Sequence, residues 1–435
     1  MKKTDESGPS GAGEAGPLAR KTLVLGVTGS IAAYKAVPLV RRLMGAGATV
    51  QVVMTRMAQQ FVGALTFEAL TGRPVATDRL EVRHDEHWPG GMAHLGLAEH
   101  ADMIVIAPAS AHCLAKLAHG LADDLLTTMI LAAECPLLVV PAMDGGMWDH
   151  PAVRENVRTL RARGVVIMEP ERGPLASGRV GTGRFPDERT IVAAISGGLC
   201  PHKDFRGRRV LITAGPTQES LDPIRFFSNR SSGKMGWALA EAARDRGADV
   251  TLIAGPTALS PPCQIAFVPI TTSEELRKAV MARFAESDVL IMAAAVADFR
   301  PVRPAPQKIS KGKGRITLIL EPTPDILMEL PGRRPGQVVV GFAAETKELV
   351  ETARRKLAAK KLDLIVANDV TEPGAGFWTD TNRVVLIDRR GQVGNLPLMP
   401  KRQVAHCVLD AVQCLTEGKD QKNRLNPRRV PSMQA

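Results

Sequence analysis

Two stretches of the chain show the same order of hydrophobic and polar positions. Residues 210–214 form an apolar run that breaks into a long polar loop, and a helical pattern of apolar residues follows Gly233. Residues 23–27 open a similar arrangement, in which Thr28-Gly29-Ser30 makes the polar break. A buried strand, a polar loop and a helix N-terminus in that order are typical of an anion-binding start to an α/β domain. Two such starts predict two fused domains.

Apolar runs that alternate with helical patterns predict a doubly wound, mostly parallel sheet in the first domain. The expected strands are residues 23–27, 50–54, 103–107, 137–140 and 165–168. Ligands of such sheets bind beyond the carboxyl ends of the strands. Gly29, Ser30, Thr55, Ser110 and Asp144 all follow an expected strand. Hydroxyl and N–H groups at helix starts suit a phosphate, although Ser and Thr also serve as ordinary N-caps.

The second domain shows the same alternation, so the fold class is α/β with two doubly wound domains. Its expected strands are residues 209–213, 250–254, 289–292, 338–342, 364–366 and 384–388, and its expected helices are 233–247, 273–285, 347–361 and 401–415. Lys308 and Lys311 lie in a Gly-rich loop that can close over a phosphate. Lys356 and Lys360 share one helix face, which is more often a solvated face than a binding site.

The chain length of 435 residues fits two domains better than one core. We expect a disordered leader over residues 1–20, a first domain over 21–200, a second over 201–415 and a basic disordered tail over 416–435. The N-terminus lacks the apolar region of a signal peptide. No run of roughly 18 apolar residues is present, so no membrane span is expected.

The net charge of +11 and the six cysteines bound the possible partners. A single Tyr, 4% aromatics and no reader motif argue against nucleic acid, and small anionic substrates explain the basic balance equally well. The cysteines form no CxxC motif, which predicts reduced thiols in a cytoplasmic protein.

Two common nucleotide motifs are absent. Gly26-Val27-Thr28-Gly29 lacks the third glycine of the dinucleotide fingerprint, and no acid is placed to hold a ribose. Gly233-Lys234 is followed by Met235, so this loop is not a P-loop.

Four motifs in the first domain carry a resemblance to a known family. GVTGSIAAYK, AHLGLAEHADMIVIAPASAHCLAKLAHGLADDLL, LLVVPAMDGGMW and PLASGRVGTGR stand in order across residues 22–200. This region resembles the flavin-dependent cysteine decarboxylases, which bind FMN. The resemblance implies that FMN oxidises a cysteine-derived thiol, that the carboxylate then leaves, and that reduced flavin reduces the enethiol. Gly29, Ser30, Thr55 and Ser110 would contact the cofactor.

His94 matches the active-site histidine of that family, and an imidazole can accept a proton at neutral pH. His84, His87, His94 and His100 also form a cluster, so a metal site or a plain surface are alternatives. A metal is disfavoured because the spacings lack a second matching pair. His84 and His87 are expected in a polar loop over residues 81–91 that covers the site.

Two residues depart from the family pattern. Asp144 stands where an amide is usual, and an ionised carboxylate cannot donate a hydrogen bond. Ser177 stands where an acidic cysteine usually protonates the reduced intermediate, and a hydroxyl is far less acidic than a thiol of pKa about 8.5. We interpret the domain as a variant decarboxylase. The alternatives are a half that is impaired in the final reduction step, or a flavin-binding protein without turnover.

The second domain closely resembles phosphopantothenate–cysteine ligases through AGPTQESLDPIRFFSNRSSGKMG, AAVADFR, GFAAET and AND. Both halves together resemble the bifunctional enzymes of bacterial coenzyme A biosynthesis. The resemblance implies CTP-dependent ligation of 4'-phosphopantothenate and cysteine through an acyl-cytidylate, and decarboxylation to 4'-phosphopantetheine. It also implies trimers of the flavin half and dimers of the ligase half.

Site residues follow from the same motifs. Asn229 matches the residue that holds the acyl-phosphate intermediate, Arg225 matches its charge partner, and Lys308 matches a lysine of the loop over the triphosphate. Mg²⁺ would shield that triphosphate, with ligands left unassigned. The KISK sequence has fewer lysines than is common in this loop. The implied nucleotide-binding residues are Met292, Ala293, Ala294, Asp298, Lys308, Pro324, Asp325, Ile326, Leu327, Phe342, Lys356 and Lys360.

Overall fold

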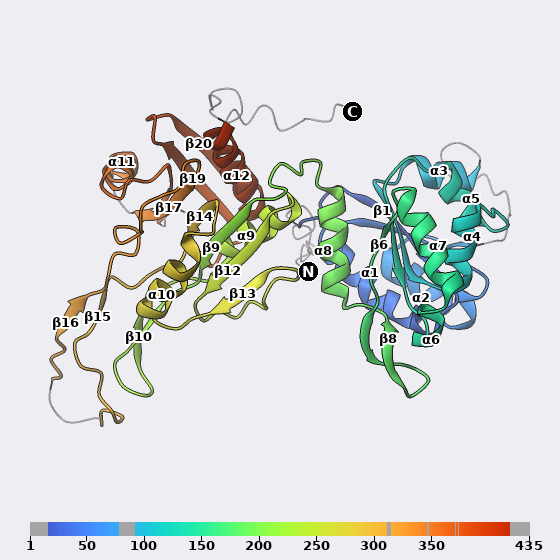
Figure 1. Ribbon diagram of the computed structural model, residues 1–435, viewed down its shortest axis with the longest axis horizontal. Helices are drawn as coiled ribbons and strands as arrows, with labels where there is room; N and C mark the ends of the chain where they lie inside the picture. Colours follow the sequence, from blue (N-terminus) through green and yellow to red (C-terminus); the bar gives the residue numbers. More distant parts are fainter. Residues whose placement is uncertain are drawn as a thin grey trace, which may run out of the picture. The chain divides into compact units, whose positions relative to one another are not determined.

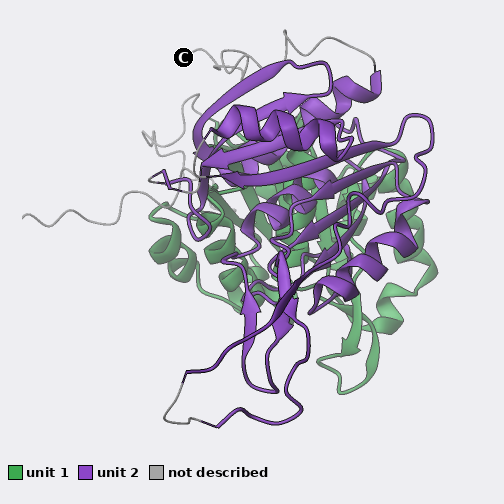
Figure 2. Cartoon of the chain, turned by 90° about the vertical axis from the view of Figure 1, so that its left-hand side faces the viewer, with its two compact units in different colours: residues 1–201 green, residues 202–435 purple. Residues whose placement is uncertain are grey.

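The computed structural model describes residues 16–77, 92–310, 315–345, 348–369, 371–372 and 374–417. These residues form two compact units (Figure 2), which meet in the sequence between Pro201 and His202. The unit boundary therefore falls next to the predicted domain boundary. Each unit contains a central, wholly or mostly parallel sheet with helices on both faces (Figure 1).

The first unit contains a six-stranded parallel sheet in the order β3-β2-β1-β4-β5-β6. A separate antiparallel pair, β7–β8, follows this sheet in the chain. The elements are β1 (Thr22–Val27), η1 (Ile31–Lys35), α1 (Ala36–Gly45), β2 (Thr49–Met54), η2 (Ala58–Gln60), α2 (Ala64–Thr71), β3 (Ala76–Thr77), α3 (Ala93–Glu99), β4 (Met103–Ala109), α4 (Ala111–His119), α5 (Leu125–Ala132), β5 (Leu137–Pro141), α6 (Gly145–Trp148), α7 (Pro151–Ala162), β6 (Val166–Ile167), β7 (Glu171–Pro174), β8 (Val180–Arg184) and α8 (Glu188–Leu199).

Strand β1 shows why the predicted strands are continuously apolar. Leu23 and Leu25 pack into a core that includes buried residues of α1 and α8. Val24 packs on the opposite face, against residues of α3 and α5. Because successive side chains of a strand point to opposite faces, a strand covered on both sides needs apolar residues at every position.

The second unit contains an eight-stranded sheet in the order β13-β12-β9-β14-β17-β18-β19-β20. Pairing is parallel as far as β18 and antiparallel between β18, β19 and β20. The elements are β9 (Arg209–Ala214), β10 (Gln218–Ser220), β11 (Phe226–Ser228), α9 (Lys234–Asp245), β12 (Asp249–Ala254), β13 (Ala266–Pro269), α10 (Ser273–Phe284), β14 (Val289–Met292), β15 (Phe299–Pro301), β16 (Leu320–Pro322), β17 (Val338–Glu345), α11 (Leu349–Ala359), β18 (Leu364–Asp369), β19 (Thr381–Asp388), β20 (Val393–Pro400) and α12 (Lys401–Glu417).

Two helical layers cover this sheet. Val210 and Ile212 of β9 share a core with α9 and α12, whereas Leu211 shares a core with α10 and α11. Every predicted strand of both domains is present, and the predicted α/β class is confirmed. The hairpins β10–β11 and β15–β16 were not predicted, because strands of three residues are too short to show a two-residue period.

The predicted ends of the domains need correction. Leu18 is 1% exposed, and its backbone N–H donates to the carbonyl of Ala46 at 2.9 Å, so residues 16–20 belong to the first unit. Thr416 and Glu417 complete α12, so these two residues are not part of a disordered tail. Residues 1–15 and 418–435 lie outside the described residues.

Two further predictions concern the chain as a whole. All six cysteines lie in the described ranges, and no disulfide joins any of them there. None of the described helices combines the length and the apolar character that crossing a membrane requires.

Candidate functional site

The second unit contains a cavity of about 680 Å³ where β14 and β17 end, and we call it the larger cavity because that of the first unit measures about 410 Å³. Asn229 lines it, together with every predicted nucleotide-binding residue except Lys308. These residues come from separate segments: the start of α9, the chain after β14, residues 323–327, β17 and the helix α11. The structure therefore brings together residues that the sequence separates by more than a hundred positions.

The N-terminus of α9 forms one wall of this cavity. Gly233 adopts a φ of +76°, and a Cβ atom at this position would lie 2.8 Å from Thr257 Cγ2. Only glycine fits this conformation and this close contact without strain. The turn leaves Gly233, Lys234 and Gly236 lining the cavity at the positive end of the helix. This wall can receive an anion.

Asn229 is held at the cavity by a hydrogen bond. Its Nδ2 donates to the carbonyl oxygen of Val296 at 2.7 Å, directly after the segment that follows β14. The preceding residue is also fixed, because Ser228 Oγ donates to the carbonyl of Thr217 at 2.7 Å. These two hydrogen bonds fix the orientation of the Asn229 amide.

Arg225 and Lys308 lie outside the cavity lining. The Arg225 guanidinium donates to Asp222 through Nε at 2.9 Å and to the carbonyl of Ile309 at 2.6 Å. Burial of Asp222 opposes its ionisation, but Arg225 and backbone N–H donors outweigh burial and hold the pKa of this carboxyl far below its usual range. Arg225 therefore anchors the segment that carries Lys308, whose own side chain is exposed. Lys311 lies outside the described residues.

Lys356 and Lys360 line the cavity, and their side chains remain 44% and 31% exposed. Lys356 pairs with Glu345 at 2.6 Å, and Lys360 pairs with Asp325 at 3.0 Å. Each ammonium group is therefore oriented by a carboxylate and remains a point charge next to the cavity.

The cavity of the first unit, of about 410 Å³, contains fewer of the predicted residues. Ser30, Asp144 and Ser177 line it. Ser30 is the N-cap of η1, and its Oγ donates to the carbonyl of Ala142 at 3.1 Å. The Ser30 hydroxyl therefore links the loop after β1 to the segment after β5 that carries Asp144.

The other predicted residues of the first unit lie outside this lining. Ser110 caps α4 by accepting the N–H of Cys113, and Thr55 accepts the N–H of Ala58. Gly29 packs against Met57, because a Cβ atom would lie 2.5 Å from Met57 Cβ. Helix capping thus accounts for the Ser110 hydroxyl and a local turn for that of Thr55, whereas a second role of either group toward a cofactor stays a prediction.

His94 lies half-buried on α3 and does not line the cavity of its own chain. His84 and His87, with the predicted covering loop, lie outside the described residues. Among the residues that the structure describes, no group of three His, Cys, Asp or Glu side chains forms a candidate metal site.

The two residues that depart from the family pattern form a hydrogen bond with each other. Ser177 Oγ donates to Asp144 Oδ2 at 2.6 Å, and the backbone N–H of Gly146 donates to Asp144 Oδ1 at 3.1 Å. The Ser177 hydroxyl and the Gly146 N–H lower the pKa of Asp144. Asp144 is therefore ionised at neutral pH, and it accepts the only proton that Ser177 can donate.

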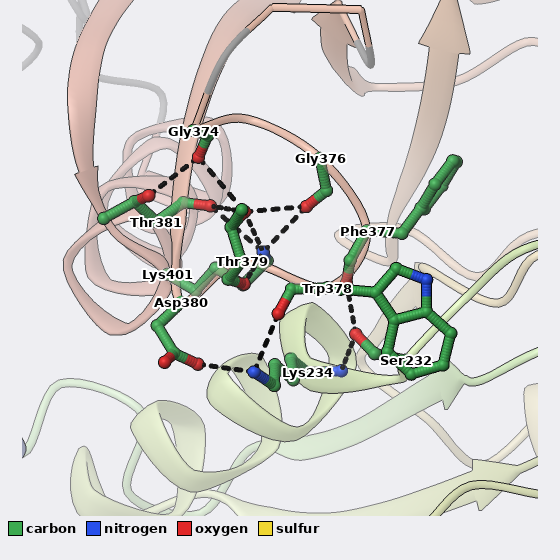
Figure 3. Close-up of polar contacts among 10 residues, drawn as sticks. All are labelled: Ser232, Lys234, Gly374, Gly376, Phe377, Trp378, Thr379, Asp380, Thr381 and Lys401. Atoms are coloured by element: carbon green, nitrogen blue, oxygen red, sulfur yellow. Dashed lines mark hydrogen bonds and ion pairs between the residues drawn. The ribbon is translucent and has the colours of Figure 1, made fainter.

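Sequence reasoning missed one wall of the larger cavity. Asn382, Lys401 and residues 375–377 line it (the loop and Lys401 are drawn in Figure 3). The available signal was Lys401 at the predicted start of a helix, where the helix dipole disfavours a cation.

Two doubly wound units, each with a cavity that charged and polar side chains help to line, define a two-site α/β enzyme. Residues 13–199 match the family model "Flavoprotein", and residues 205–415 match "DNA/pantothenate metabolism flavoprotein C-terminal domain". The coenzyme A biosynthesis bifunctional protein CoaBC of Bacillus subtilis is 44% identical over 93% of this chain and 100% of its own length. The chain belongs to this family of bifunctional coenzyme A biosynthesis proteins.

Solved structures match each half separately. The crystal structure of the C-terminal domain of a CoaBC protein is 40% identical, covers 50% of this chain and 100% of that domain, and has a TM-score of 0.42. The FMN-dependent cysteine decarboxylase SpaF is 40% identical, covers 42% of this chain and 97% of its own, and has a TM-score of 0.36.

Proposed function

We propose that the second unit ligates 4'-phosphopantothenate and L-cysteine with CTP, and that the first unit decarboxylates the product with FMN to give 4'-phosphopantetheine. The observation that carries this proposal is the single cavity in which Asn229 and the predicted nucleotide-binding residues meet. Membership of the bifunctional family supports the pairing of the two reactions.

In the proposed ligation the substrate carboxylate attacks the α-phosphate of CTP and releases pyrophosphate. The cysteine amine then displaces CMP from the acyl-cytidylate. Asn229, the N-terminus of α9 and the two lysines Lys356 and Lys360 place donors and positive charge where negative charge builds. Mg²⁺ would be bound mainly by the triphosphate, and Asp298 offers an exposed carboxylate in the same cavity.

The first-unit cavity fits an anionic cofactor. Lys35 and Arg184 supply positive charge to its lining, and Ser30 supplies a hydroxyl. FMN, when bound, supplies two-electron redox chemistry. Asp144 holds the Ser177 hydroxyl in place, and His94 is the proposed proton acceptor. The six cysteines form no disulfide among the described residues, which is consistent with the proposed cytoplasmic location.

Since His94 does not line the cavity of its own chain, we propose that a neighbouring copy brings this residue to the site. Ile31 and Tyr34 at the cavity are 56% and 58% exposed, and a second copy would cover this apolar surface. The protein is then a homo-oligomer, with trimers of the flavin half and dimers of the ligase half as the arrangement that the family resemblance implies.

A second candidate function is an active ligase fused to a flavin half that stops before the final reduction. The 2.6 Å hydrogen bond from Ser177 to Asp144 favours this candidate, because it directs the hydroxyl proton to a carboxylate rather than to substrate. An ionised Asp144 also repels a substrate carboxylate.

One experiment separates the two candidates. FMN-loaded protein is supplied with 4'-phosphopantothenate, cysteine, CTP and Mg²⁺, and CMP, CO₂ and 4'-phosphopantetheine are measured. Release of all three supports the complete pathway. CO₂ release with an oxidised enethiol product supports the impaired half, accumulation of phosphopantothenoylcysteine contradicts decarboxylation, and absence of CMP contradicts the ligase.

A further inference from the structure

Lys401 is a buried cation at the wall of the larger cavity. It is the first residue of α12, it is 7% exposed, and it lines the cavity. Its Nζ donates to the carbonyl oxygens of Gly376 at 3.2 Å, of Thr381 at 3.0 Å, and of Thr379. None of the ion pairs among the described residues includes this ammonium group.

This position is unfavourable for a lysine in three respects. A buried ammonium group normally requires a carboxylate partner. A cation at the N-terminus of a helix opposes the helix dipole. Burial and then the nearby Lys234 lower the pKa of Lys401 to about 8, only partly offset by Asp380. A lysine at this position therefore lowers the stability of the fold unless its hydrogen bonds to the carbonyl groups offset these costs.

The carbonyl groups that surround Lys401 belong to one segment, residues 374–381, which we call the carbonyl loop. Thr381 Oγ1 donates to the carbonyl of Gly374 at 2.7 Å. Thr379 Oγ1 lies 2.9 Å from the carbonyl oxygen of Gly376 and 3.1 Å from that of Gly374. These hydroxyl groups and Lys401 turn the carbonyls of the loop inward (Figure 3).

The carbonyl loop also contacts the start of α9. Lys234 Nζ donates to the carbonyl of Trp378 at 2.9 Å and pairs with Asp380 at 2.7 Å. Ser232 Oγ donates to the carbonyl of Phe377. Figure 3 shows the loop between Lys401 on one side and Ser232 and Lys234 on the other. One loop thus connects the N-termini of α9 and α12 at the cavity.

A second observation points to a ligand at the same wall. Asn382 lines the cavity and is 4% exposed, yet its Oδ1 has no hydrogen-bond partner among the described residues. A buried acceptor without a partner costs free energy unless a bound molecule donates to it. The wall that carries Lys401 therefore also holds a buried acceptor that no described residue satisfies.

We propose that Lys401 is a positioning residue of the ligase, which holds the carbonyl loop as a wall of the cavity and thereby keeps Lys234 and the start of α9 in place for a phosphate group of the substrate. This inference rests on the proposed ligase function. The phosphate group belongs either to CTP or to 4'-phosphopantothenate, and separate kinetic measurements distinguish these two sources.

The test compares Lys401→Met, Lys401→Arg and Thr379→Val with the wild-type protein. Lys278→Met is the matched control, because the Lys278 side chain is 71% exposed on α10 and does not line the cavity. KM for CTP, KM for 4'-phosphopantothenate and kcat of ligation are measured. Decarboxylation of supplied phosphopantothenoylcysteine and the melting temperature are measured in parallel.

We expect Lys401→Met to raise KM for one of the two phosphate-bearing substrates about tenfold or more, with kcat changed less than about twofold. Lys401→Arg keeps the charge and should recover most of the loss. Thr379→Val loosens the loop without removing a charge and should raise the same KM by a smaller factor. Decarboxylation and the Lys278→Met control should match the wild type.

Unchanged KM values in a folded Lys401→Met variant contradict the proposal, as does a loss of kcat alone. If Lys401→Met does not fold, Thr379→Val decides: a raised KM supports the positioning role, and an unchanged KM contradicts it. A wild-type protein that releases no CMP would instead contradict the proposed ligase function itself.

Discussion

In the second unit, Asn229 and all but one of the predicted nucleotide-binding residues line one cavity, whereas in the first unit only Ser30, Asp144 and Ser177 do so. Both cavities form at the carboxyl ends of parallel strands. The difference lies in where the predicted residues stand. Met292 and Phe342 belong to strands that end at the cavity, but His94 stands on a helix.

This contrast limits what a strand-end position predicts. Parallel strands bring their carboxyl ends to one edge, so residues that follow different strands meet without further information. A residue on a helix can face a neighbouring element or another copy of the chain. The proposed ligase site therefore gathers most of its predicted residues within one unit, all but Arg225 and Lys308, while the proposed decarboxylase site depends on how copies assemble.

The largest expected effect concerns the proposed decarboxylase site, which we expect a neighbouring copy to complete. His94→Asn should slow decarboxylation of supplied phosphopantothenoylcysteine by about 1,000-fold, because it removes the proposed general base. CMP release by the ligase should continue at the wild-type rate. His119→Asn, at an exposed histidine of α4, is the control. Normal decarboxylation in the His94 variant would exclude this residue as the base.

A mixing experiment sharpens the same comparison. The experiment co-expresses His94→Asn chains with chains that carry both Ser177→Ala and Asp144→Ala. If a neighbouring copy supplies His94, the mixture should recover part of the decarboxylase activity that each variant lacks alone. Hybrid oligomers would contain some sites with an intact His94 and an intact Asp144–Ser177 pair. Absence of any recovery in hybrids shown to form would indicate that each site uses its own histidine.

Asn229→Asp should reduce CMP release about 100-fold, because a carboxylate cannot donate the hydrogen bond that Asn229 makes and repels a phosphate. Decarboxylation of supplied phosphopantothenoylcysteine should remain unchanged. Asn395→Asp, at an exposed position of β20, is a matched control. Loss of both activities in both the Asn229 and the His94 variants would contradict two separate sites.

The double variant Asp144→Asn, Ser177→Cys restores the pair that is usual in the decarboxylase family. We expect the ratio of reduced to unreduced product to rise about tenfold, because a thiol is a much stronger acid than a hydroxyl and an amide does not capture its proton. The two products are separated by mass spectrometry. An unchanged ratio would show that the wild-type pair already supports the final reduction.

The smallest expected effect is a pH dependence of the ligase alone. Because the pKa of Lys401 in the fold is lowered to about 8, raising the pH above this value removes the charge that the carbonyl loop surrounds. KM of ligation should rise about threefold between pH 7 and pH 9, since a neutral amine is a weaker donor. Lys234 and Asp380 are the charged groups that face Lys401 and modulate this step.

The fold should not become less stable over this step. The pKa of Lys401 is lower in the folded than in the unfolded chain, so deprotonation favours the folded state between the two pKa values. Unfolding free energy and KM are therefore measured over the same pH range. A KM step of equal size in Lys401→Met would assign the pH dependence to another group.

The sequence by itself determined the two sheets and the membership of the family. Val210, Leu211 and Ile212 must be apolar because β9 is covered on both faces, and this requirement is visible as a continuous apolar run. The motif around Asn229 is also visible in the sequence, because adjacent residues specify the turn between a strand and the helix that follows it.

Only the tertiary structure decided which distant side chains meet. Ser177 bonds to Asp144 in the lining of the first-unit cavity, and Arg225 pairs with Asp222 and anchors the segment of Lys308. Lys401 holds a loop that begins 27 positions earlier in the chain, at Gly374. Such contacts depend on how a loop packs against a helix that forms independently of it. No local pattern of hydrophobic and polar residues encodes that packing, because its energy arises from groups that become neighbours only in the folded chain.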